Sequence, residues 1–494
     1  MSTLPTSTPS AEGVDAAGLL ALVDDLEGAA GVEPHSLMVL RHGRVVAAGW
    51  WAPYTADRVH HLYSLSKTFT ATAAGLAVGE GLLDLDEPVV GCFPELDAEV
   101  TDPRTRSMLV RHLASMSTGH TTDMWEPVVR TGASDPVRAF LRIPPPREPG
   151  SVFAYNQPAT YTLAAIVQRR TGQTLLDYLR PRVLDPVGIG EAVWQEYPPG
   201  QQLGFSGLHA TTDAVARLGQ LYLQDGVWDG ERLLPEGWVG QVSTAHVPTP
   251  HEGDAHALDW RQGYGLQAWV GQHGFRGDGA YGQFCLVLPE HDAVVAITGQ
   301  STDMQRVLDG VWAHLLPALQ GAGRTADDEA LAGRLAGLAL PRSPGEPSPP
   351  APPERQDRWD GAVFDPDASS RRVQPTTNEV RVRRVGDSDG WEVVLLDAGR
   401  EVRARVGGEP WTVTDPGGRE VPVAVSGGWL DEGTLDVGVA FLESPHRLQV
   451  TCRVPVGPGP GTVSLRWVTQ PLGSGRLASL RAPGLSGRGP QADG

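Results

Sequence analysis

Ser64 and Lys67 are the two residues of this chain whose types and spacing point most directly to chemistry. Lys67 is the only lysine among 494 residues, while arginine supplies the other 39 of the 40 formally cationic side chains. A guanidinium stays protonated in proteins, whereas a buried amine can lose its proton and act as a base. The first hypothesis is therefore a serine nucleophile activated by a neutral lysine.

The three-residue spacing fits a catalytic pair at the start of a helix. We expect this helix to run from about Ser64 to Glu80 and to end at Gly81. Residues three apart share a helix face, so the amine of Lys67 reaches the serine hydroxyl. The helix dipole favours an alkoxide there, and the unpaired N–H of Ser64 can donate to a developing oxyanion. A surface lysine that follows a capping serine is the alternative, and spacing alone does not decide between them.

Four stretches of the sequence together resemble one protein superfamily. They are Tyr63–Phe69 (Tyr-Ser-Leu-Ser-Lys-Thr-Phe), Gly81–Val89 (Gly-Leu-Leu-Asp-Leu-Asp-Glu-Pro-Val), Val110–Gly119 and Phe205–Asp213. In this order they resemble the serine β-lactamase and penicillin-binding-protein superfamily. The closest likeness is to the branch of class C β-lactamases, D-alanyl peptidases, D-aminopeptidases and β-lactamase-like esterases. The resemblance covers about residues 30–320 and implies an α+β fold, in which helices and an all-helical subdomain flank an antiparallel sheet.

The family's second motif, Tyr-x-Asn, matches Tyr155-Asn156-Gln157. By this resemblance the Tyr155 hydroxyl relays protons between Ser64 and the leaving group, helped if the Lys67 cation lowers its pKa. The third position is Gln157 instead of asparagine, which keeps an amide on a longer arm. Either Gln157 or Asn156 is then the amide that orients the substrate. A buried tyrosine that satisfies one hydrogen bond is the alternative reading of Tyr155.

The third motif, Lys-Thr-Gly on an inner strand, is best matched by Gly277-Asp278-Gly279. The resemblance implies that Gly279 lets substrate lie close to the strand and that the N–H of Ala280 completes the oxyanion hole. The lysine that would bind a substrate carboxylate is absent, so Arg276 or His273 is a candidate substitute. Asp278 works against anionic β-lactams and peptides that end in a free carboxylate. A glycine-rich hairpin turn is the alternative.

Strand-like and helix-like patterns divide the chain into two folded domains. Strand-like runs near both ends of the resembling region, with helices between them, predict one α+β domain whose sheet combines both ends. These runs lie at 36–41, 44–50, 264–270, 283–288 and 293–298.

A proline-rich stretch separates this α+β domain from a later segment of alternating short strands, which predicts a small all-β barrel or sandwich. We therefore expect the following division: a disordered start (1–12), the hydrolase-like domain (13–340), a stiff linker (341–358), the all-β domain (359–482) and a disordered tail (483–494).

Composition excludes several other classes of protein. A net charge of −19 without a long basic run argues against nucleic-acid binding. Three widely spaced cysteines predict buried thiols and no disulfide framework. No signal peptide, membrane-spanning run, dinucleotide fingerprint or metal-ligand spacing is visible, which predicts a cytoplasmic protein without membrane attachment, metal or cofactor. The sequence gives no oligomeric state.

We therefore expect a serine hydrolase that cleaves a small ester or amide through an acyl-enzyme on Ser64, with Lys67 and Tyr155 handling protons. The altered third motif favours an esterase or amidase. A D-amino-acid-specific peptidase or a weak β-lactamase is the alternative within this class. A non-catalytic module that binds an acyl group on Ser64 without turnover is the alternative from another class.

Overall fold

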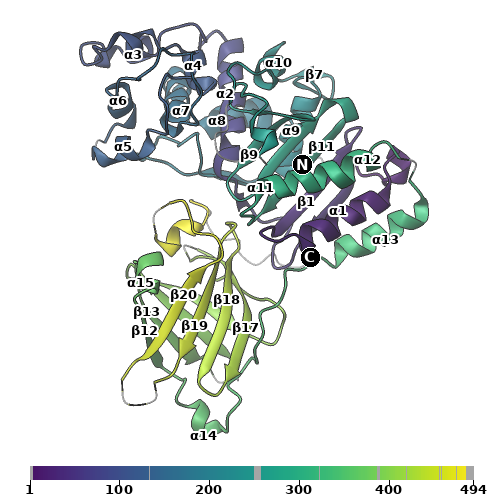
Figure 1. The fold of residues 1–494 in the computed structure, drawn as a ribbon, viewed down its shortest axis with the longest axis vertical. Helices are drawn as coiled ribbons and strands as arrows, with labels where there is room; N and C mark the ends of the chain where they lie inside the picture. The colour runs from purple at the N-terminus through teal and green to yellow at the C-terminus, as the bar shows by residue number, and fades with distance from the viewer. Residues whose placement is uncertain are drawn as a thin grey trace. The chain divides into compact units, whose positions relative to one another are not determined.

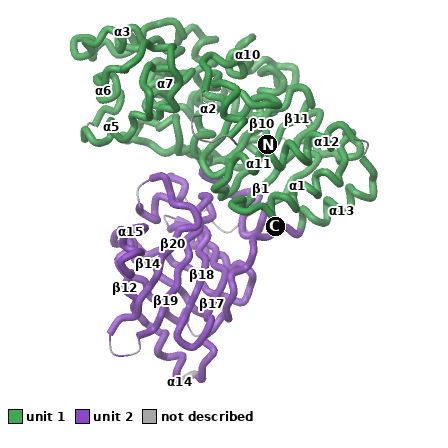
Figure 2. The backbone as a smooth tube through the Cα atoms, viewed as in Figure 1, with its two compact units in different colours: residues 1–49, 62–336 green, residues 50–61, 337–494 purple. Residues whose placement is uncertain are grey.

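The structure, a computed structural model, divides into two compact units: residues 1–49 with 62–336, and residues 50–61 with 337–494 (Figures 1 and 2). The residues that it describes are 4–132, 134–249, 257–321, 323–386, 390–418, 420–455, 457, 459–473 and 475–484.

Within these described residues, the first unit is built on a six-stranded sheet in the order β2-β1-β11-β10-β9-β8. The N-terminal strand β1 pairs antiparallel with β11, so the sheet combines both ends of the unit, as the sequence predicts. The sheet strands are β1 (Pro34–Arg41), β2 (Arg44–Trp50), β8 (Trp269–Gly271), β9 (Gly274–Gly279), β10 (Gln283–Leu288) and β11 (Ala293–Gly299). Shorter strands are β4 (Ala192–Trp194), β5 (Leu208–Ala210), β6 (Val227–Trp228) and β7 (Glu231–Arg232).

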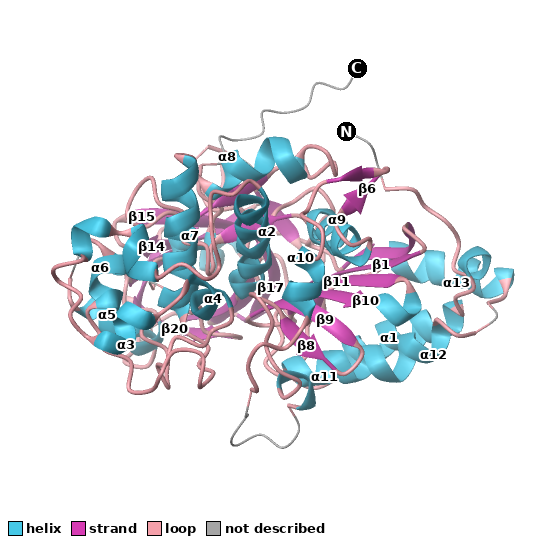
Figure 3. Cartoon of the chain, turned by 90° about the horizontal axis from the view of Figure 1, so that it is seen from above, coloured by secondary structure: helices cyan, strands magenta, loops and turns pink. Residues whose placement is uncertain are grey.

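Helices cover both faces of this sheet. Helix α9 packs on β10 and β11, where a Cβ atom on Gly219 would meet Val294, and α1, α11 and α12 lie on the opposite face (Figure 3). The expected all-helical subdomain is confirmed around α7, against which α2, α4 and α6 pack. The helices of this unit are α1 (Ala16–Gly28), α2 (Ser66–Gly79), α3 (Pro103–Ser107), α4 (Val110–Ala114), α5 (Trp125–Arg130), α6 (Pro136–Leu141), α7 (Gln157–Thr171), α8 (Leu175–Leu179), α9 (Thr212–Leu223), α10 (Trp238–Ser243), α11 (Met304–Gly310), α12 (Leu316–Ala318) and α13 (Thr325–Ala336).

Two local expectations for this unit are wrong. The strand predicted over 264–270 is reduced to β8, because Gln267 adopts a left-handed conformation (φ 61°) that interrupts an extended chain. The disordered start is wrong for residues 4–12. Ser7 N–H donates to Val45 O at 3.0 Å and Val45 N–H to Pro5 O at 2.8 Å, so this segment pairs with β2.

The described strands of the second unit form one nine-stranded sheet, in the order β15-β14-β13-β12-β20-β19-β18-β17-β16, that closes nearly into a barrel. The terminal strands β15 and β16 of this order lie near each other. Only the β12–β20 pairing is parallel among those described. The strands are β12 (Ala362–Pro366), β13 (Thr377–Arg384), β14 (Trp391–Asp397), β15 (Arg400–Val406), β16 (Thr412–Thr414), β17 (Val423–Asp431), β18 (Thr434–Phe441), β19 (Arg447–Arg453) and β20 (Gly461–Trp467).

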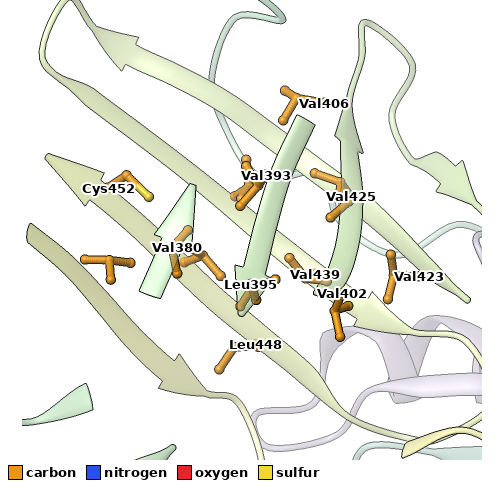
Figure 4. Close-up of a cluster of buried hydrophobic side chains, with 14 of the residues drawn as sticks. Val380, Val393, Leu395, Val402, Val406, Val423, Val425, Val439, Leu448 and Cys452 are labelled. Atoms are coloured by element: carbon orange, nitrogen blue, oxygen red, sulfur yellow. The ribbon is translucent and has the colours of Figure 1, made fainter. Parts of the chain in front are cut away.

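Alternating side chains fill the interior of this barrel. Along β19 every second residue is buried, as a strand with one inward face requires. Inward valines and leucines such as Val393, Val425 and Leu448 pack together (Figure 4), and Trp359, Trp391 and Trp429 join the same core. The sequence left a barrel or a sandwich open, and the structure is a nearly closed barrel.

The proline-rich segment is not a free linker. Glu346 and Trp429 exchange backbone hydrogen bonds of 3.0 and 2.9 Å, so this segment runs along β17. A Cβ atom on Gly428 would overlap the carbonyl oxygen of Glu346, which explains the glycine there. The same segment includes the short helix α14 (Pro353–Gln356), and α15 (Ser370–Val373) follows β12.

Residues 50–61 belong with the second unit, although the sequence places them inside the first domain. Ala52 exchanges backbone hydrogen bonds with Leu338 and Leu340, at 3.0 and 2.9 Å, and Arg58 forms a 2.9 Å ion pair with Asp415. The segment ends in the short strand β3 (His60–His61). The tail from 485 lies outside the described residues, and 483–484 form a turn.

Cys92, Cys285 and Cys452 are buried free thiols, as predicted. Across the part of the chain that the structure describes, none of the helices combines the length and the apolar character needed to cross a bilayer.

Candidate active site

The predicted nucleophile Ser64 lies on a turn that precedes α2. Tyr63–Leu65 form a 3-10 turn and α2 begins at Ser66, so the helix starts two residues later than expected. The Ser66 hydroxyl donates to Tyr63 O at 2.6 Å and accepts from Leu208 N–H at 3.1 Å. Because Ser66 is committed to the backbone, Ser64 is the serine of this stretch with a hydroxyl available for reaction.

Three oxygen atoms surround the amine of Lys67, whose side chain is only 1% exposed. Its Nζ lies 3.1 Å from Ser64 Oγ, 2.7 Å from Gln157 Oε1 and 2.9 Å from Phe205 O. The amide and backbone oxygens can only accept hydrogen bonds. A neutral amine therefore donates its two N–H groups to them, and its lone pair remains directed at the Ser64 hydroxyl.

Burial lowers the pKa of Lys67 from its ordinary 10.5 to about 7. The carboxylates of Asp123 and Asp278 act in the opposite direction, because nearby negative charge favours the ammonium form. Near neutral pH the amine is consequently neutral in a large fraction of molecules. That is the state in which it can take a proton from Ser64.

Tyr155 lies beside the nucleophile, but its pKa moves opposite to the expected direction. Burial, followed by the charge of Asp278, raises the pKa of Tyr155, and its hydrogen bond with Ser64 only partly offsets this. The condition that Lys67 lowers the pKa of Tyr155 is not met, because burial disfavours the charged phenolate. The ring lies 4.6 Å from Lys67 Nζ and stacks on Trp269 with centroids 5.6 Å apart. Tyr155 is therefore a neutral phenol, suited to passing protons and not to acting as the base.

The amide that reaches Lys67 belongs to Gln157, the first residue of α7. Asn156 is fully buried: its Oδ1 accepts from Met124 N–H at 2.9 Å, and its Nδ2 donates to Thr118 Oγ1 at 3.3 Å. Of the two amides that the sequence left open, the geometry therefore favours Gln157. Asn156 holds the preceding loop.

Strand β9 carries the third motif and passes very close to the nucleophile turn. A Cβ atom on Gly279 would overlap the carbonyl oxygen of Leu62, and one on Gly277 would overlap Thr68 Oγ1. Both positions therefore require glycine, for close packing of β9 against α2 and the turn before it (Figure 1). This approach brings Ala280, which directly follows β9, to the same end of α2 as Ser64.

The candidate substitutes for the missing lysine do not reach into the site as free cations. Arg276 is 2% exposed, and its Nε lies 3.2 Å from the carboxylate of Asp278. His273 precedes β9, six residues before Gly279, and packs against Trp312. A strand of that length separates it from Gly279 by roughly 20 Å.

Sequence reasoning missed two participants in the site. Asp123 Oδ1 accepts from Gln157 N–H at 2.9 Å, a contact that nothing in the sequence signals because 34 residues separate the two. The Phe205 carbonyl was not assigned a role, although it lies in a stretch that resembles the family. Two tryptophans differ in their surroundings. Trp125 is partly exposed and packs on Phe205, whereas Trp194 is buried and donates to a backbone oxygen.

Comparison with known families identifies the family of this chain. The family model described as Beta-lactamase matches residues 20–319, which is more than half of the chain, and the chain belongs to that family.

Two curated relatives show how similar this chain is in sequence to known proteins. The chain is 25% identical over 280 residues to the 6-aminohexanoate-dimer hydrolase of Paenarthrobacter ureafaciens, covering 53% of this chain and 71% of that protein. It is 27% identical over 314 residues to penicillin-binding protein 4 of Amycolatopsis lactamdurans, covering 54% and 80%. Among solved structures, a provisionally assigned 6-aminohexanoate-dimer hydrolase from Bacillus anthracis superposes with a TM-score of 0.51 at 20% identity, covering 65% of this chain and 87% of that one. The structural likeness supports the fold alone.

Proposed function

We propose that this chain hydrolyses a small ester or amide through a covalent acyl-enzyme on Ser64. One observation carries the proposal: a buried amine with a pKa of about 7 lies within hydrogen-bonding distance of Ser64 Oγ, Gln157 Oε1 and Phe205 O. In its neutral form this amine can donate to the amide and backbone oxygens and accept the proton of the serine hydroxyl. A structural lysine would gain nothing from such burial, because each charge removed from water costs free energy. The arrangement is therefore best explained as an activated nucleophile.

Acylation follows from this arrangement. Lys67 Nζ takes the hydroxyl proton while Ser64 Oγ bonds to the substrate carbonyl carbon, and the backbone N–H groups of Ser64 and Ala280 donate to the oxygen that becomes negative. As the tetrahedral intermediate collapses, the bond to the leaving alcohol or amine breaks. Tyr155, hydrogen-bonded to Ser64, passes the proton held by Lys67 to that leaving group.

Deacylation uses the same groups in reverse. Water gives a proton to Lys67 and attacks the acyl carbon, the bond to Ser64 Oγ breaks, and Ser64 regains a proton. Because the intermediate is itself an ester, the site must be able to cleave esters. The 6-aminohexanoate-dimer hydrolase among the relatives supports an amide as the other substrate class.

The test is a substrate panel of p-nitrophenyl esters, D-alanyl p-nitroanilide and a chromogenic cephalosporin, with Ser64→Ala as control. We expect sustained turnover of an ester or anilide that the substitution abolishes. Equal turnover by the folded Ser64→Ala variant would overturn the proposal. A preference for the D-alanyl anilide would identify the peptidase alternative. Release of a single equivalent followed by a stable adduct would identify a module that binds acyl groups without turning over.

A further inference from the structure

Beside the reaction centre, strand β9 carries a buried ion pair that the mechanism does not use. Arg276 and Asp278 are two residues apart, so their side chains lie on the same face of the strand. Their exposed fractions are 2% and 7%, and Arg276 Nε lies 3.2 Å from Asp278 Oδ2. The charge of Asp278 acts on both Lys67 and Tyr155. The Arg276 guanidinium also lies 6.0 Å from the centroid of the Trp269 ring, which stacks on Tyr155, so the pair borders the place where a substrate must bind.

The arginine of this pair retains an unused hydrogen-bond donor. Its Nη1 donates to Asp259 O at 3.0 Å, and its guanidinium lies over the ring of Trp260, 4.4 Å from the centroid. Among the described residues, no acceptor lies within hydrogen-bonding distance of Arg276 Nη2, although the atom is buried. A buried donor without an acceptor is unfavourable, so binding of an acceptor there stabilises the complex. The Nη2 group of Arg276 can therefore donate a hydrogen bond to an anionic group.

Asp278 determines whether the Arg276 guanidinium can bind an anionic group of a substrate. With the carboxylate in place the pair is neutral, and an approaching carboxylate meets the negative charge of Asp278. Without it, the one remaining carboxylate that acts on Arg276 among the described residues is that of Asp259. That carboxylate already accepts hydrogen bonds from Gln272, Gln305 and Trp312. The Arg276 guanidinium would then be free to bind a carboxylate with two parallel hydrogen bonds. The side chain at position 278 thus determines whether the site repels or attracts anions.

We infer that Asp278 is a specificity-determining residue, which neutralises Arg276 and so excludes substrates that carry a carboxylate beside the scissile bond. The substrates of this chain are then esters or amides that are uncharged or cationic at the end facing β9. This inference rests on the proposed hydrolase function and adds to it the charge of the substrate.

The test compares matched esters that differ by one carboxylate. On the acyl side the pair is p-nitrophenyl pentanoate and mono-p-nitrophenyl glutarate, and on the leaving-group side it is phenyl acetate and 3-acetoxybenzoate. The wild type should favour the neutral member in at least one pair. Asp278→Asn should raise the anionic-to-neutral ratio of kcat/KM by roughly tenfold or more in at least one pair, since opposing like charges cost several kcal/mol and 1.4 kcal/mol is tenfold. The pair that responds identifies the side of the scissile bond that faces β9.

The matched control is the double variant Asp278→Asn/Arg276→Gln, which has no cation and should lose the gain. Asp278→Ser serves as a second variant if Asp278→Asn does not fold with an unpaired arginine. An unchanged ratio in the folded single variants, or a gain that persists in the double variant, overturns the inference. So does a wild type that cleaves the anionic esters as fast as the neutral ones, a result that needs no variant. A wild type that cleaves neither these esters nor the D-alanyl anilide would instead remove the proposed function itself.

Discussion

The pH dependence of acylation tests the role of Lys67 quantitatively. A pKa of about 7 leaves about half of the Lys67 amines neutral at pH 7. At the ordinary pKa of 10.5, roughly one molecule in three thousand would be neutral at that pH. Because the base must be neutral, kcat/KM should rise about tenfold per pH unit below pH 7 and level off above it. Asp123→Asn should move this rising limb to lower pH, because the Asp123 carboxylate raises the pKa of Lys67.

The assay is kcat/KM for a neutral p-nitrophenyl ester from pH 5 to 9 at constant ionic strength, with the rate for Ser64→Ala subtracted. This parameter reports the ionisation of the free enzyme, which is the state that the structure represents. A flat profile, or a limb that rises near the ordinary lysine pKa, would refute the assignment of Lys67 as a depressed-pKa base. An Asp123→Asn limb that shifts to higher pH would refute the electrostatic reasoning, because its sign would be reversed.

Three further substitutions probe separate parts of the site. Lys67→Arg keeps the positive charge but removes the base, so acylation should fall at least about a hundredfold while circular dichroism stays native; near-normal hydrolysis would contradict the mechanism. Gly279→Ala should displace β9 from the nucleophile turn and lower kcat by roughly a hundredfold or more, the cost of losing an oxyanion donor. Gly240→Ala is its control, because a Cβ atom there meets nothing within 4 Å, and equal effects of the two would refute the packing argument. Tyr63 and Tyr281 both have left-handed φ angles, of 49° and 69°, and flank the two oxyanion donors with their rings 5.5 Å apart, edge to face. If the contact between the two rings positions the oxyanion donors, Tyr281→Ala should reduce kcat with little change in KM, whereas Tyr281→Phe should retain activity. Equal kinetics of the two variants would count against a positioning role of the Tyr281 ring.

Contacts in the site that depend on a short stretch of chain could be predicted from the sequence. The approach of Lys67 to Ser64 follows from a three-residue separation at a helix start, which fixes their distance whatever surrounds them. The glycines at 277 and 279 were expected to allow close approach to a strand, and they do so. The remaining relations depend on the surroundings. Burial reversed the expected shift of Tyr155, and only the path of the chain before α7 shows that Asn156 turns away while Gln157 reaches the amine.

The wrong predictions about the fold have a common cause. Residues 4–12 and the proline-rich segment have compositions typical of disordered or extended chain, yet each pairs with a distant strand, β2 or β17. Residues 50–61 belong with the second unit through contacts to positions more than 280 residues later. Pairing of this kind depends on the partner strand, so a window of local sequence does not contain it.

The central claim is that Ser64 carries the acyl group, and peptide mass mapping after rapid quenching tests it most directly. The protein is mixed with excess p-nitrophenyl ester, quenched during the first turnover and digested. We predict an added acyl mass on the peptide that contains Ser64, formed together with a burst of p-nitrophenol and absent in Ser64→Ala. Acylation of another residue, or sustained turnover by the folded Ser64→Ala protein, would contradict the account.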